Sequence, residues 1–153
     1  MLNRALAIIH DEHRSLGAVL HGLRFLVREM QEKGSEPDFK LLWAMLHYMD
    51  AFSERLHHPK EDAYLFARLR ERTREADEII ATLEQQHVDS AERLRQLEQA
   101  LGQLEAGAPG SLEAFGENGD PRFGAKPDHE FRDLFTRIVN LAPPPIGVGP
   151  AHG

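Results

Sequence analysis

The feature that most constrains the fold is a repeat of apolar residues that stand alternately three and four positions apart. Between residues 3 and 33 this repeat is unbroken only if His13 is counted among its members, which are otherwise Leu6, Ile9, Leu16, Leu20, Leu23, Val27 and Met30. Such spacing lines up one apolar stripe along a helix and is typical of helices packed in a bundle. The sequence therefore predicts a long first helix that carries a histidine on its buried face.

Two further long helices are predicted by the same pattern. One runs from about residue 37 to 69, and we expect Pro59 to kink it, because proline removes a backbone hydrogen bond and crowds the preceding turn. The other runs from about residue 75 to 106, and its repeat is again complete only when a histidine, His87, is included. Both histidines occupy positions where leucine would normally pack.

The chain changes character after residue 106. Residues 107–127 are rich in glycine and proline and are predicted to form a loop, with about one helical turn at 111–115. A short amphipathic helix and a proline-rich tail follow over residues 128–153, so residues 1–106 form the core. We therefore predict an all-α, up-down helical bundle of three long helices plus a short C-terminal helix.

Composition excludes several classes of protein. The 153 residues carry a formal net charge of −7, whereas nucleic-acid and membrane-surface binders need excess positive charge. The absence of cysteine rules out disulfides, iron–sulfur clusters and cysteine nucleophiles. No apolar run approaches the roughly 18 residues of a membrane span, and the N-terminal apolar stretch is too short for a signal peptide. We expect a cytoplasmic protein that binds neither nucleic acid nor membrane.

Four residues form the strongest candidate site. His57 and Glu61 stand four positions apart, so both project from one helical face. If the three helices are antiparallel neighbours, a rise of about 1.5 Å per residue places these two residues, His13 and His87 in one layer of the bundle. Taken singly, a core histidine usually only hydrogen-bonds to a neighbouring helix, and a lone His-x-x-x-Glu pair usually faces solvent. Together they predict a transition-metal site, with iron preferred over zinc or manganese.

The remaining histidines carry less weight. His58 neighbours His57 but should point about 100° away on a regular helix, although the expected kink at Pro59 could exchange the roles of the two. His10, His21 and His47 fall beside the apolar stripes, and we expect them at the surface.

Several stretches resemble the haemerythrin-like, HHE cation-binding proteins. They are IIHDEHRSL at 8–16, LHHPKED at 56–62 and LEQQHVDS at 83–90, and the ending at 128–149 is similar to the C-terminus of a bacterial branch of that family. The resemblance implies a four-helix bundle around two non-haem irons bridged by carboxylates, which bind oxygen or related small ligands.

The resemblance also assigns roles to residues. It implies that His13, His57 and His87 are terminal ligands on the three long helices and that Glu61 is the bridging carboxylate. In the family a fourth helix supplies another histidine and an acidic residue, and the stretch between residues 111 and 121 contains no such pair. The resemblance thus implies an incomplete di-iron site, and we expect at most one tightly bound ion per chain.

These observations predict a non-haem iron protein that binds oxygen or nitric oxide, handles iron or acts as a sensor. We do not predict an enzyme, because the sequence shows no nucleophile–base pair and no phosphate-binding loop, although an oxidase- or peroxidase-like role stays open. The competing interpretation is a metal-free helical interaction protein derived from such a domain. Because three long helices leave one flank of a four-sided core uncovered, we also expect a homodimer.

Overall fold

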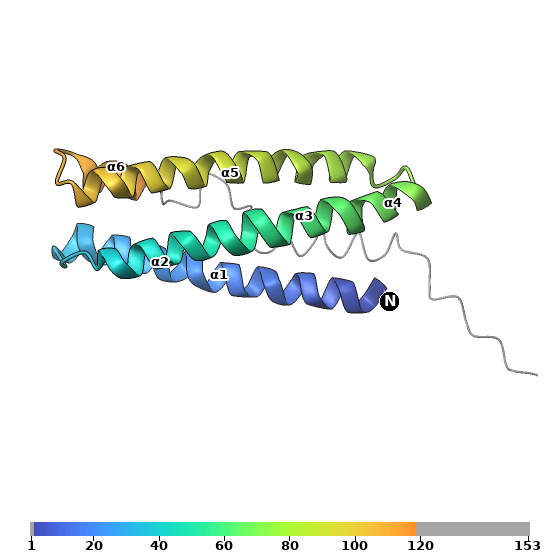
Figure 1. Ribbon diagram of the computed structural model, residues 1–153, viewed down its shortest axis with the longest axis horizontal. Helices are drawn as coiled ribbons and strands as arrows, with labels where there is room; N and C mark the ends of the chain where they lie inside the picture. Colours follow the sequence, from blue (N-terminus) through green and yellow to red (C-terminus); the bar gives the residue numbers. More distant parts are fainter. Residues whose placement is uncertain (1, 119–153) are drawn as a thin grey trace, which may run out of the picture.

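Three long helices lying side by side make up most of the structure, a computed structural model that describes residues 2–118 (Figure 1). The first is α1 (Leu2–Lys33) and the third is α5 (Asp77–Glu105), close to the bounds predicted from the apolar repeats. No strand occurs within residues 2–118, which confirms the predicted all-α class. The predicted short helix and tail at residues 128–153 lie outside the described part of the chain.

The second long helix runs from residue 39 to 72 and contains two π-helical segments. Its successive parts are α2 (Phe39–Met49), η1 (Asp50–His57), α3 (His58–Lys60), η2 (Glu61–Phe66) and α4 (Ala67–Arg72). Pro59 lies in the short α turn between the π segments, and the helix continues through it. The missing proline hydrogen bond is therefore accommodated by wider turns: the His58 N–H, for example, donates to the Ser53 carbonyl five residues back.

The π segments determine which residues of the second long helix are buried. In a regular α-helix of 3.6 residues per turn, every fourth residue drifts by about 40° around the axis, and five such steps carry it to the far side. Wider π turns offset that drift. As a result, a single buried face holds every fourth residue over twenty positions, namely Met49, Ser53, His57, Glu61, Leu65 and Leu69.

A short helix, α6 (Ser111–Asn118), lies within the stretch predicted to be loop, where only about one turn at 111–115 was expected. Gly107 and Gly110 adopt positive φ angles of 72° and 71°, which let the chain reverse after α5. The Phe115 side chain is fully buried in the core, and α6 packs against both α1 and α5. Burial of Phe115 therefore anchors this short helix to the core.

The apolar core is divided into two clusters. The cluster near α6 contains Leu23, Val27, Met30, Leu42, Leu46, Met49, Leu94, Leu97, Ala100, Leu101 and Phe115. The cluster near the start of α1 and the end of α4 contains Ile9, Leu65, Phe66, Leu69, Ala76, Ile80 and Leu83. Between the two in sequence on all three long helices lie the predicted site residues His13, His57, Glu61 and His87.

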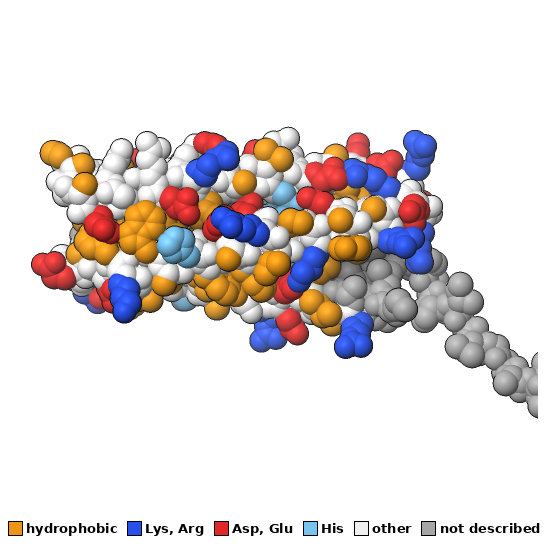
Figure 2. All heavy atoms as spheres, viewed as in Figure 1, with side chains coloured by type: hydrophobic (Ala, Val, Ile, Leu, Met, Phe, Trp, Pro, Cys, Tyr) orange, Lys and Arg blue, Asp and Glu red, His pale blue; other side chains and the backbone are white. Residues whose placement is uncertain are grey.

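The surface mixes charged and apolar side chains (Figure 2). Leu41 on the second long helix is exposed, and so are three later large hydrophobic side chains of that helix, Tyr48, Leu56 and Tyr64. Their spacing of eight residues puts them along one side of that helix. No helix within residues 2–118 is long and apolar enough to cross a membrane.

Candidate metal centre

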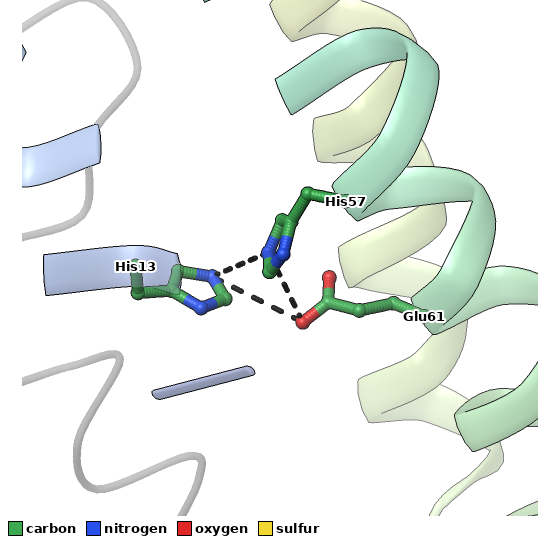
Figure 3. A group of neighbouring side chains, drawn as sticks. All are labelled: His13, His57 and Glu61. Atoms are coloured by element: carbon green, nitrogen blue, oxygen red, sulfur yellow. Dashed lines mark hydrogen bonds and ion pairs between the residues drawn. The ribbon is translucent and has the colours of Figure 1, made fainter. Parts of the chain in front are cut away.

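Three of the four predicted site residues meet in one compact group (Figure 3). Nε2 of His13 lies 3.3 Å from Nε2 of His57, and Oε1 of Glu61 lies 3.5 Å from the latter and 4.0 Å from the former. His13 comes from α1, and the other two come from the π-containing part of the second long helix. His57 is completely buried and Glu61 nearly so.

The outer nitrogens of these imidazoles are held by groups that can only accept a hydrogen bond. Nδ1 of His13 lies 2.8 Å from the Ile9 carbonyl oxygen, and Nδ1 of His57 lies 2.6 Å from Oε2 of Glu12. Each Nδ1 must therefore carry the proton and donate it. In the neutral imidazoles, both Nε2 atoms then point lone pairs at one another and at the Glu61 carboxylate. A cation or an extra proton between these atoms would satisfy such an arrangement.

His87 lies on the other side of the Glu61 carboxylate. Its Nε2 is 3.1 Å from Oε2 of Glu61, while its Nδ1 is 3.0 Å from Oδ1 of Asp62. The two oxygens of Glu61 therefore face different histidines: Oε1 faces His13 and His57, and Oε2 faces His87. The structure thus brings the three predicted histidines around the carboxylate of the fourth predicted residue, Glu61, with His87 outside the compact group of three.

The electrostatics favour the ligand forms of Glu61 and His13. Burial raises the pKa of Glu61, but the His87 hydrogen bond and the neighbouring imidazoles outweigh burial and leave that pKa below its usual value. Burial lowers the pKa of His13, against a smaller opposing effect of Glu61. At neutral pH the pair therefore presents an ionised carboxylate and a neutral imidazole, the forms that bind a metal ion. For His87, burial lowers the pKa, but the carboxylates of Glu61 and Asp62 outweigh burial and leave that pKa above its usual value.

His58, which should point about 100° away from His57 on a regular helix, is mostly buried and lies beside the His87 ring. Its ring stacks on the His87 ring with centroids 3.9 Å apart, while Phe66 packs at 5.9 Å from His87. Nε2 of His58 lies 3.2 Å from Oγ of Ser53, and Oε2 of Glu54 lies 3.5 Å from its Nδ1. The exposed positions of His10, His21 and His47 agree with expectation.

Sequence reasoning missed the acidic residues that hold the imidazoles. Glu12 and Asp62 are the acceptors for His57 and His87, and Lys60 extends the first of these contacts with Nζ 2.7 Å from Oε1 of Glu12. Each of the three stands next to a predicted site residue in the sequence, at positions 12, 62 and 60. Charged residues beside other polar residues are too common on helices to have singled these three out.

The donor spacings fit a transition-metal ion. Ligand atoms about 2.1 Å from one ion, at tetrahedral or octahedral angles, lie about 3.0–3.4 Å apart. The two closer separations in the group, 3.3 and 3.5 Å, are already near this range. Two imidazole nitrogens and one carboxylate oxygen are donors typical of non-haem iron and zinc sites.

Comparison with known protein families agrees with the geometry. The model of the haemerythrin HHE cation-binding domain matches residues 4–139, well over half of the chain. The chain belongs to the haemerythrin HHE family. The resemblance inferred from the three histidine-containing stretches is confirmed, and so is the haemerythrin-like helical bundle. No significant match was found among curated proteins or among solved structures.

Membership of the haemerythrin HHE family accounts for the polar layer in the core. The matched span contains all of the residues grouped around Glu61 and runs on beyond residue 118. The family is defined by cation binding, and the structure contains a buried group of two histidines and one glutamate; the two findings agree. This haemerythrin-domain chain has a site that could hold a metal ion.

Proposed function

We propose that this haemerythrin-domain protein holds a non-haem iron ion at His13, His57 and Glu61, with His87 on the far oxygen of Glu61. Its role would be to bind oxygen or nitric oxide, to handle iron or to act as a sensor, rather than to transform an organic substrate. Imidazole-rich ligation with one carboxylate suits iron. It suits zinc and manganese less specifically, so these are the less favoured ions.

One observation carries the proposal: the Nε2 atoms of His13 and His57 converge on the buried carboxylate of Glu61. Because Ile9 and Glu12 fix the protons of His13 and His57 on Nδ1, both Nε2 atoms are left as donors of lone pairs toward Glu61. Without a cation or an extra proton between them, the two facing Nε2 atoms and Oε1 of Glu61 would repel one another in a buried site, which costs free energy. A metal ion would supply a positive charge there and open positions for a diatomic ligand.

Metal content is the direct test. The protein would be purified without affinity metals and reconstituted with ferrous ion under anaerobic conditions, then analysed by elemental analysis. We expect about one tightly bound ion per chain and a change in the optical spectrum on exposure to air or nitric oxide. A folded helical protein that binds no iron, zinc or manganese would instead support the metal-free interaction protein. Two tightly held irons per monomeric chain would contradict the expected stoichiometry.

The proposal includes a homodimer. Leu16 and Leu20 on the α1 stripe are only partly buried, and Tyr48, Leu56 and Tyr64 leave apolar surface on the second long helix. Exposed apolar side chains in a row favour contact with another copy. Light scattering over a dilution series should give a dimer mass at micromolar concentration. A monomer that melts cooperatively and binds no hydrophobic dye would rule this part out.

A further inference from the structure

A charged chain leads from the protein surface to the buried His57. Nζ of Lys60 lies 2.7 Å from Oε1 of Glu12, and Oε2 of Glu12 lies 2.6 Å from Nδ1 of His57. Exposure falls steadily along the chain, from 47% for the lysine side chain through 13% for the glutamate to 0% for the histidine. The two ends of one carboxylate therefore connect a solvent-accessible cation to the edge of the proposed metal ligand.

The two contacts act on the imidazole in opposite directions. A carboxylate that accepts the Nδ1 proton adds electron density to the ring and makes Nε2 a better metal donor. A lysine on the second oxygen of the same carboxylate draws charge away from it, because a charge-assisted hydrogen bond localises negative charge on the bonded oxygen. Positive charge at Lys60 also opposes a cation bound at Nε2.

We infer that Glu12 strengthens metal binding at His57 and that Lys60, acting through Glu12, weakens it. The inference rests on the proposed function and assigns a tuning role to two residues that do not touch the ion. Lys60 is thus a positioning and charge-balancing residue whose removal should tighten the site. A purely structural clamp predicts the reverse, because loss of either partner would then loosen His57.

The test compares cobalt(II) affinity in Glu12→Gln and Lys60→Met, measured by competition with a chromophoric chelator. Replacement of an outer partner changes metal affinity on the order of ten- to hundredfold, so Glu12→Gln should bind about tenfold more weakly or worse. Lys60 acts one bond further out, and we expect Lys60→Met to bind roughly three- to tenfold more tightly. Lys60→Arg keeps the charge and should bind as the unmodified protein does.

A second ion pair on α1 provides matched controls. Nζ of Lys33 lies 2.7 Å from Oε1 of Glu29, at the far end of the helix from His13. Lys33→Met and Glu29→Gln make the same changes in net charge and should leave cobalt affinity unaltered. The cobalt absorption bands should keep their shape in every variant that binds the ion, since the ligands themselves are unchanged.

Each outcome separates this inference from the proposed function. If the unmodified protein binds no cobalt, the metal site itself is wrong. If it binds cobalt and Lys60→Met binds with equal or lower affinity, the tuning role of Lys60 is overturned while the metal site stands. If Glu12→Gln binds as tightly as the unmodified protein, the role of Glu12 is overturned in the same way.

Discussion

Glu61→Gln is expected to lower the affinity for a transition-metal ion by at least about a hundredfold, more than substitutions of outer partners usually do. The glutamine fills nearly the same space as the glutamate but carries no negative charge. Both oxygens of Glu61 face imidazoles, with Oε1 toward His57 and Oε2 toward His87. The substitution therefore removes the negative charge that all of the proposed histidine ligands face. Metal occupancy after dialysis, measured by elemental analysis, checks the result.

Alanine variants of the histidines extend this test. His13→Ala, His57→Ala and His87→Ala should each lose most of the bound metal, while His21→Ala and His47→Ala change exposed residues and should keep it. His58→Ala separates the two adjacent histidines of the second long helix. We expect it to retain metal, because His58 contacts Ser53 and Glu54 rather than Oε1 of Glu61. Retention in His57→Ala together with loss in His58→Ala would exchange their roles.

Removal of the metal with a chelator is expected to lower the melting temperature by on the order of 15 °C. A ligand present at about a thousand times its dissociation constant stabilises the folded state by about 4 kcal/mol, and a domain of this size shifts by several degrees per kcal/mol. Here the ion would also neutralise the charge of a buried carboxylate and accept the lone pairs of two facing nitrogen atoms. Circular dichroism melts with and without chelator provide the measurement.

Glu61→Gln serves as the control for the thermal experiment. It should melt at the same temperature with and without chelator, because it has little metal to lose. An unmodified protein whose melting temperature is insensitive to chelator, although elemental analysis shows that the metal has left, would mean that the polar layer is satisfied without an ion.

The helices were predictable because burial in a bundle imposes a spacing that the sequence must display. The repeat through Leu23, Val27 and Met30 identified α1, and the repeat through Leu94, Leu97 and Leu101 identified α5. These residues are buried in the structure, as expected. The candidate site followed from the same reasoning. A histidine that replaces leucine in such a repeat, as His13 and His87 do, needs a polar partner or a ligand in the core.

The remaining features depend on contacts that spacing does not encode. The expectation of a kink at Pro59 did not include the π-helical turns on both sides of it, nor the buried position of His58. The choice between a break and a π turn depends on what the buried face must contact across the bundle. Glu12 likewise became recognisable only when α1 was placed against the second long helix, because its partners are 45 and 48 residues away in sequence.

The division of the core into two apolar clusters separated by charged and polar groups has a consequence for how the helices align. A bundle held only by leucine-like stripes tolerates sliding of one helix by a heptad, about 10.5 Å, since apolar residues still meet apolar residues. In this chain such a slip would set the Glu61 carboxylate against hydrocarbon and leave it unpaired, which is strongly unfavourable. The residues proposed to hold the ion therefore also fix the register of the bundle. They favour one alignment of the three long helices over alignments shifted by a heptad.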